Sequence, residues 1–171
     1  MTNPHPATTH PQTLITADPK VPAISIVREF DASADKVYRA HTDPELLVKW
    51  LGPRDLVMEV DFWDCRTGGS YRYLHRRQGA DGPEEYAFHG CFHEVRPDRI
   101  VQTFTYEGYP DGVSLDTMIL EDLDGGRTRL TINSIVESFE SRDMILASGM
   151  ETGVVEGYEQ LDELLAQEDD R

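Results

Sequence analysis

The chain has 171 residues and a formal net charge of −16, and 39% of its residues are hydrophobic and 28% charged. Length and composition are typical of one soluble globular domain with a single core. The negative charge excludes a nucleic-acid-binding protein and a polybasic membrane-surface protein, because both need positive charge. No run of about 18 apolar residues occurs, so we expect no transmembrane helix and no membrane partner.

The beginning of the chain and its two cysteines indicate a cytoplasmic protein. Residues 1–20 hold four of the ten prolines and few core-forming residues, so we expect a disordered N-terminal arm there. This segment has neither the basic region nor the apolar region of a secretory signal. Cys65 and Cys91 form neither a zinc pattern nor a disulfide framework, and free thiols are the simplest interpretation.

After the arm, the sequence predicts a strand at 21–30 and two short helices. Ser33 is a typical N-cap for the first helix. Asp43-Pro44-Glu45 begins the second with a capping carboxylate and a proline at the first helical position. Gly52-Pro53 ends it, since glycine suits the C-cap and proline blocks continuation.

Turn residues then divide the middle of the chain into six further strands. We expect these strands at 57–64, 70–77, 85–95, 100–106, 113–122 and 127–137. Strands do not alternate with helices, which excludes a doubly wound parallel sheet.

Apolar residues at three- and four-residue steps predict one long C-terminal helix over Ser141–Gln167. Gly149, Gly153 and Gly157 are four residues apart and would share one face of it, each at a cost of roughly 1 kcal/mol against alanine. Either another backbone comes close to this face, or the missing side chains leave room for a ligand. We therefore expect an α+β domain over 21–167, in which a curved seven-stranded antiparallel sheet wraps this helix, followed by an acidic tail at 168–171.

Alternation along the strands predicts which side chains face the helix. In the strand at 70–77, Tyr71, Tyr73 and His75 are expected to point inward. In the next strand, the inward set is Tyr86, Phe88, Gly90, Phe92 and Glu94. For the strand at 113–122 two sets compete: Leu115, Thr117 and Ile119 against Asp116, Met118 and Leu120.

Tyrosines and a histidine among phenylalanines are typical of a ligand cavity with a few oriented polar groups. The alternative is that the tyrosines reach the rim and bind water or backbone. We predict ten ligand-binding residues, in which the tyrosines and His75 orient the ligand and the rest exclude water: Trp50, Phe62, Tyr71, Tyr73, His75, Tyr86, Phe88, Phe104, Met144 and Met150.

The sequence holds no motif for catalysis, metal or cofactor binding. His89 and His93 are four residues apart on a strand, about 13 Å, which is too far for one ion bound at about 2 Å per ligand. No G-x-S-x-G elbow, P-loop or G-x-G-x-x-G motif occurs. For His75 a packed, hydrogen-bonded ring is favoured over a catalytic one, and for Glu94 a structural anchor is favoured over a catalytic group.

Six segments, in this order and spacing over about 21–166, resemble the SRPBCC superfamily. Within it they are most similar to domains of the kind found in the activator of heat-shock-protein-ninety ATPase. The segments are Lys49–Pro53, Asp64–Tyr71, Gly90–Glu94, Pro97–Thr103, Gly126–Leu130 and Gly149–Tyr158. The resemblance implies a START-like helix-grip fold, in which a curved sheet wraps a C-terminal helix around a hydrophobic cavity that the glycines would enlarge.

The resemblance leaves several functions open, because this superfamily includes lipid and sterol carriers, hormone receptors and polyketide cyclases. Our first hypothesis is binding of a small hydrophobic or aromatic molecule between sheet and helix. The second is a polyketide-cyclase-like enzyme that uses His75, a tyrosine or Glu94 to polarise a carbonyl or move a proton. The third is a protein-interaction module, such as a chaperone regulator in a stress response or the partner of a transcription factor. The resemblance also implies a homodimer formed through the sheet or the helices.

Overall fold

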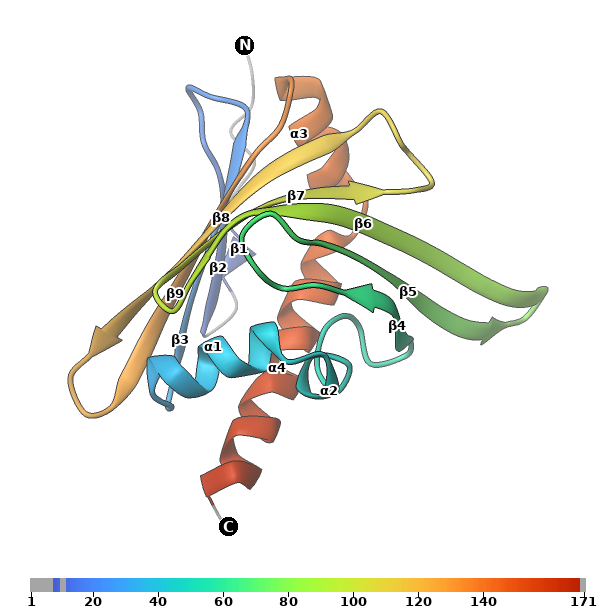
Figure 1. Cartoon of the computed structure of the whole chain (residues 1–171). Helices are drawn as coiled ribbons and strands as arrows, with labels where there is room; N and C mark the ends of the chain where they lie inside the picture. The colour runs from blue at the N-terminus through green and yellow to red at the C-terminus, as the bar shows by residue number, and fades with distance from the viewer. Residues whose placement is uncertain (1–7, 10–11, 170–171) are drawn as a thin grey trace.

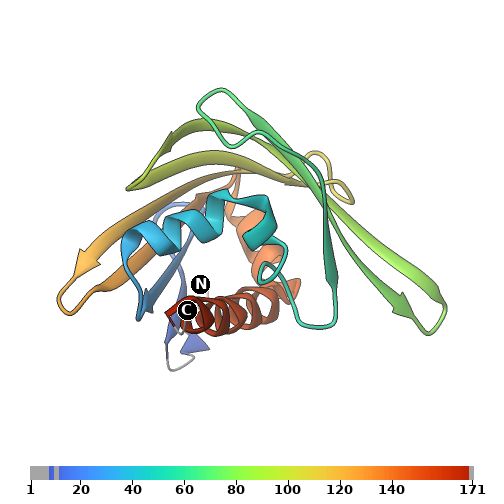
Figure 2. The ribbon, with the colours of Figure 1, turned by 60° about the horizontal axis from the view of Figure 1, so that its bottom comes forward.

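A nine-stranded antiparallel sheet arches over a long C-terminal helix in the computed structural model, which describes residues 8–9 and 12–169 (Figure 1). The strand order is β1-β2-β3-β9-β8-β7-β6-β5-β4. Viewed roughly along the C-terminal helix, the sheet is strongly curved, and the helices pack against its concave face (Figure 2). The predicted α+β helix-grip architecture is confirmed, although the sheet has nine strands rather than seven.

The strands are β1 (Thr8–Thr9), β2 (Thr13–Ala17), β3 (Ala23–Phe30), β4 (Val57–Trp63), β5 (Ser70–Gly79), β6 (Gly82–Arg96), β7 (Arg99–Tyr106), β8 (Val113–Leu123) and β9 (Arg127–Ile135). The helices are α1 (Ala34–Thr42), α2 (Pro44–Leu47), α3 (Phe139–Ala147) and α4 (Met150–Asp169). The side chains of Ser33 and Asp43 cap α1 and α2, as the sequence predicts. None of the helices in the described part of the chain combines the length and the apolarity needed to cross a membrane.

The predicted disordered arm is wrong for residues 12–20. Thr13–Ala17 form β2, which pairs with β3 from Thr13 opposite Arg28 to Ala17 opposite Ile24. Thr13 and Ile15 are buried, so this β-branched stretch adds a strand to the sheet and covers part of the core. The prediction for residues 1–7 and 10–11 lies outside the described residues.

The predicted single C-terminal helix is two helices. Ser138 caps α3, with its side chain accepting a hydrogen bond from the Ser141 amide. At the other end, Gly149 has a φ of +85°, the left-handed conformation that terminates a helix. Gly149 therefore follows the C-cap residue Ser148, ends α3 and is not part of a helix face. At its far end α4 continues to Asp169, so the predicted acidic tail begins inside the helix.

The two remaining glycines of α4 have different surroundings. A Cβ on Gly157 would lie 3.2 Å from the Gly52 nitrogen and 3.3 Å from the Trp50 carbonyl oxygen. Gln160 fixes this contact by donating to the Trp50 and Gly52 carbonyls at 3.2 and 2.9 Å. A Cβ on Gly153 would meet only Pro53, at 3.6 Å. Close backbone approach therefore explains Gly157, whereas Gly153 has room beside it.

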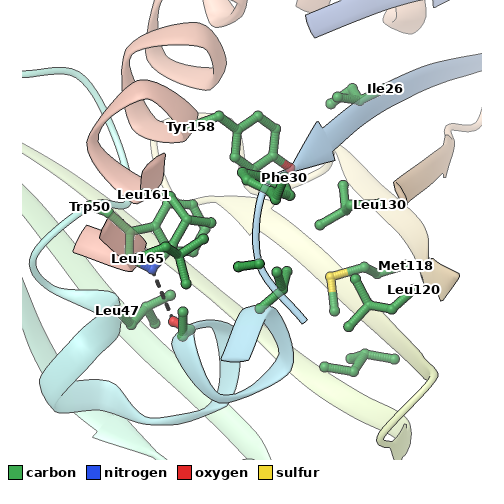
Figure 3. Close-up of a cluster of buried hydrophobic side chains, with 14 of the residues drawn as sticks. Ile26, Phe30, Leu47, Trp50, Met118, Leu120, Leu130, Tyr158, Leu161 and Leu165 are labelled. Carbon is green, nitrogen blue, oxygen red and sulfur yellow. Dashed lines mark hydrogen bonds between the residues drawn. The ribbon is translucent and has the colours of Figure 1, made fainter. Parts of the chain in front are cut away.

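A cluster of buried hydrophobic side chains lies between the sheet and the helices, and Trp50, in the segment between α2 and β4, is one of its members (Figure 3). The Trp50 indole donates to the Ala40 carbonyl at 2.9 Å and stacks on Tyr158, with 5.9 Å between ring centroids. Leu161 and Leu130, both fully buried, close the same cluster from α4 and from β9. The packing therefore holds α1, α2 and α4 together beneath one half of the sheet.

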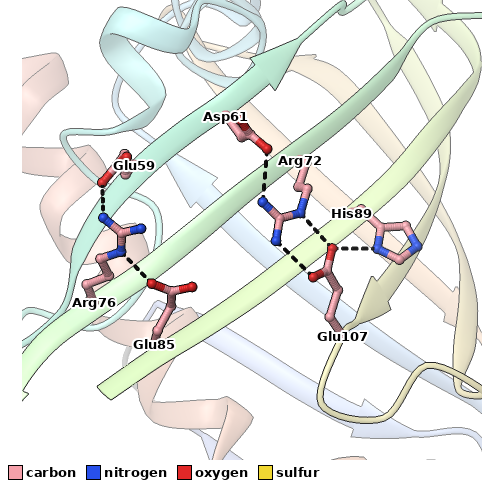
Figure 4. Close-up of polar contacts among 7 residues, drawn as sticks. All are labelled: Glu59, Asp61, Arg72, Arg76, Glu85, His89 and Glu107. Atoms are coloured by element: carbon pink, nitrogen blue, oxygen red, sulfur yellow. Dashed lines mark hydrogen bonds and ion pairs between the residues drawn. The ribbon is translucent and has the colours of Figure 1, made fainter. Parts of the chain in front are cut away.

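On the outer face of the sheet, two arginines each form ion pairs with carboxylates of two neighbouring segments (Figure 4). Arg72 of β5 donates to Asp61 at 2.9 Å and to Glu107 at 2.8 and 3.0 Å. Arg76 pairs in the same way with Glu59 and Glu85. The side chains of these ion pairs are 30–57% exposed, so solvent screens them and each adds only modestly to stability.

Glu107 provides a test of this network. Hydrogen bonds from Arg72 lower its pKa to about 2. Because the folded-state value lies below the unfolded one, the carboxylate stabilises the fold above pH 4.5, and this stabilisation disappears as the pH falls toward 2. We expect Arg72→Ala to return the pKa of Glu107 toward 4.5 in an NMR titration. Arg76→Ala should leave it unchanged, and an unaltered Glu107 pKa in Arg72→Ala would contradict this account.

Candidate functional site

A cavity of about 360 Å³ lies between the concave face of the sheet and α4. Side chains from β3 to β9, from α1 and α2, from the segment at 50–53 and from α4 contribute to its wall. The structure places seven of the ten predicted ligand-binding residues on this wall: Trp50, Tyr71, Tyr73, His75, Phe88, Phe104 and Met150.

Phe62 lies outside the cavity because β4 contains a bulge. Val60 pairs with Tyr73, but the register shifts before the next pair, so that Phe62 lies opposite the outward-facing Arg72. Phe62 is 46% exposed, and Trp63 takes the inward position beside Tyr71. One inserted residue exchanges the two faces of a strand, and simple alternation misses it.

Met144 and Tyr86 also lie away from the cavity. Met144 is on α3, beyond the break at Gly149, and is 48% exposed. The Tyr86 side chain lies near the outer end of the β5–β6 hairpin, where its hydroxyl donates to Glu84 at 3.0 Å. Neither residue lines the cavity: Tyr86 lies too far along its strand, and Met144 lies on a separate helix from the cavity-lining part of α4.

Glu94 is displaced by a second bulge, in β6. Phe92 lies opposite the cavity-lining Gln102, but after the register shift Glu94 lies opposite Val101. The Glu94 carboxylate accepts a hydrogen bond from Arg99 at 2.9 Å. The predicted inward orientation is therefore wrong. Glu94 is an anchor at the strand end, which leaves the cyclase hypothesis without this carboxylate.

The aromatic wall of the cavity comes from the inner faces of β5, β6 and β7. Tyr73 stacks on Phe88 at 5.2 Å between centroids, and Phe88 stacks on Phe104 at 5.4 Å. The Tyr71 hydroxyl donates to the Thr103 carbonyl at 2.7 Å and accepts from Gln102 at 3.2 Å. Tyr71 is thus bound to the backbone, as the alternative interpretation proposed, yet it is buried and not at the rim.

Asp116 is a cavity residue that the sequence left undecided. On β8 the inner set is Asp116, Met118 and Leu120, whereas Leu115 and Ile119 are exposed. Ser114 and Ser134 donate to the Asp116 carboxylate at 2.9 and 2.7 Å. Burial raises the pKa of Asp116, and the two hydroxyls only partly offset that effect. Each set holds two large apolar residues and one polar residue, so alternation alone did not choose the set with the carboxylate.

Two neutral histidines complete the polar groups of the wall. Burial lowers the pKa of His75, whose ring packs so closely on Gly52 that a Cβ there would lie 2.4 Å from Cε1. The His41 Nδ1 atom donates to the Val37 carbonyl at 2.7 Å, and burial lowers its pKa to about 4. The Nε2 atoms of both rings are buried without a hydrogen-bond partner among the described residues.

The low pKa of His41 predicts a pH dependence of stability. The fold favours the neutral ring, so its contribution is complete above pH 6.5 and declines as the pH falls from 6.5 toward 4. We expect His41→Phe to flatten the fall in the free energy of unfolding over this range, measured by urea denaturation at several pH values. His93→Gln, at an exposed position, is the matched control. The same pH dependence in His41→Phe and in the wild type would contradict the prediction.

The arched sheet, the long helix that it grips and the cavity between them define a helix-grip domain. The family model for activator of Hsp90 ATPase homolog 1-like proteins matches residues 31–166. The chain belongs to this family.

Solved structures of bacterial proteins share the fold over nearly the whole chain. Protein Ms6760 of Mycobacterium smegmatis is 28% identical, with a TM-score of 0.78, and the match covers 94% of this chain and 97% of that one. A protein of Arthrobacter aurescens is 31% identical, with a TM-score of 0.78 and coverage of 90% and 91%. One from Rhodobacter sphaeroides is 28% identical, with a TM-score of 0.77 and coverage of 90% and 97%. No curated protein matches the chain.

Proposed function

We propose that this protein binds a small, largely apolar or aromatic molecule in the cavity between the sheet and α4. The observation that carries the proposal is the cavity itself, about 360 Å³ in volume and walled mainly by aromatic and aliphatic side chains. Its volume falls within the roughly 300–1,000 Å³ of small-molecule sites. The few polar groups on the wall are of the kind that orient a ligand in such sites.

Three large wall residues have their polar ends bound to backbone, which supports a cavity that keeps its shape. The indoles of Trp50 and Trp63 donate to the carbonyls of Ala40 and Thr42, each at 2.9 Å, and Tyr71 donates to Thr103. These bonds fix the rings and leave their apolar surface to line the cavity. A wall arranged before binding reduces the entropy lost when a ligand enters.

Both tryptophans of the chain line the cavity, so intrinsic fluorescence reports its occupation. We expect phenylbutanol, an apolar probe with a weakly absorbing ring, to change the tryptophan emission saturably and to give matching affinity by calorimetry. Val154→Phe, which places a ring into the cavity, should weaken binding, whereas Thr152→Phe, on the exposed side of the same helix turn, should not. If neither phenylbutanol nor any member of a collection of apolar compounds binds, the proposal is wrong.

A further inference from the structure

The cavity wall carries one carboxyl group and no cationic group among the described residues. Among the described residues that line it, Asp116 alone has a carboxyl group, and none has an ammonium or guanidinium group. His41 and His75 do not supply the missing positive charge, because burial lowers the pKa of both rings. The cavity therefore offers no cationic partner to the carboxylate of a fatty acid or of any other anionic ligand.

Asp116 is fixed in place but not fully paired. Both hydrogen bonds that described residues donate to it, from Ser114 and Ser134, end on Oδ1. Oδ2 is left for another partner. The two hydroxyls are neutral donors, so they orient the carboxyl group without balancing its charge.

Aromatic residues line the same cavity as this carboxyl group. Burial raises the pKa of Tyr71, Tyr73 and Tyr158, and the Asp116 charge adds to the effect at each hydroxyl. These tyrosines come from β5 and α4, whereas Asp116 lies on β8. The charge of Asp116 therefore acts on hydroxyl groups of other cavity walls. Trp50 and Phe88 extend the aromatic wall. The negative faces of aromatic rings attract cations, most strongly where water is excluded.

We infer that the ligand is an organic cation, a protonated amine on a small apolar or aromatic body, and that Asp116 is its counter-ion. This inference rests on the proposed function, since it assigns a chemical class to the molecule in the cavity. A bound ammonium group satisfies Oδ2 and restores the charge balance of a buried carboxylate. The net charge of −16 also raises the concentration of cations near the protein.

Three compounds with the same carbon skeleton test the inference: phenylbutylamine, phenylbutanol and phenylbutyrate. We expect calorimetry at neutral pH to rank the amine first, about tenfold tighter than the alcohol, as one desolvated charge pair predicts. The acid should bind most weakly. Asp116→Asn should bring the affinity for the amine down to that for the alcohol. Asp122→Asn, at an exposed position of the same strand, should leave the ranking unchanged.

The outcomes separate this inference from the proposed function. If the alcohol or the acid binds the wild type as tightly as the amine, the cation inference is overturned and the cavity remains a binding site. An amine preference that persists in a folded Asp116→Asn variant overturns the role of Asp116. If none of the three compounds binds, the cation inference is overturned, and the collection of apolar compounds decides the proposed function. The ranking in the wild type needs no variant, so it stands even if Asp116→Asn does not fold.

Discussion

Replacing Trp50 with alanine should lower the free energy of unfolding by about 3–5 kcal/mol, the usual cost of removing a large buried aromatic side chain. Trp50 is 3% exposed, and it joins the helices α1 and α4. Its indole donates to the Ala40 carbonyl on α1, and its ring stacks on Tyr158 of α4. The rings of Trp50 and His41 pack in a T-shaped arrangement, with 4.7 Å between their centroids. The substitution removes these contacts together and leaves a void beside the cavity.

Urea denaturation monitored by circular dichroism measures this loss. Trp50→Phe should recover part of it, because the ring remains and only the indole hydrogen bond and some volume are lost. Val48→Ala, at a half-exposed position in the same segment, is the matched control and should change stability by less than about 0.5 kcal/mol. A loss below about 1 kcal/mol in Trp50→Ala would show that this ring is not the junction of the helices.

Gly157→Val should lower the free energy of unfolding by about 2–3 kcal/mol through overpacking. The substituted Cβ would lie against the backbone of Trp50 and Gly52, which has no rotamer to yield. Moving α4 away would also stretch the two hydrogen bonds from Gln160.

Gly153→Val is the matched control, one turn earlier on the same helix. Its Cβ would meet only a ring carbon of Pro53 at ordinary contact distance, so we expect a change within about 1 kcal/mol. Equal destabilisation by the two variants would mean that helix propensity, and not close approach, explains the cost. The pair therefore distinguishes the two interpretations that the glycine spacing left open.

The three glycines show how far periodicity reaches. A four-residue spacing correctly indicated that the C-terminal segment needs small residues, but it treated them as one feature. In the structure Gly149 ends a helix, Gly153 borders the cavity and Gly157 admits a backbone. Each role depends on which groups face the glycine, and tertiary packing brings those groups from distant parts of the chain.

The starts of α1 and α2 were predictable from local chemistry, whereas α2 ends at Leu47, before the predicted stop at Gly52-Pro53. Ser33 and Asp43 cap helices as expected, because capping needs only a side chain and nearby amides. The facing of Tyr71, Tyr73 and His75 was also predictable, since β5 pairs without interruption with β6.

The rest of the candidate site depends on register, which is not a local property. The bulge in β4 places Trp63 instead of Phe62 on the cavity side, and the bulge in β6 turns Glu94 away from the cavity. Neither bulge contains a glycine that would have indicated it in the sequence. The inward facing of Asp116 follows from the pairing of β8 with both β7 and β9. His41 reaches the cavity only because α1 lies beneath the sheet.

Native mass spectrometry of the purified protein, compared with its mass after denaturation, tests the central claim that the cavity holds a small molecule. We predict an additional mass that denaturation releases, that added phenylbutanol or phenylbutylamine displaces, and that Val154→Phe lowers in occupancy. A protein that carries no additional mass and takes up neither compound under conditions that preserve its fold would contradict the claim.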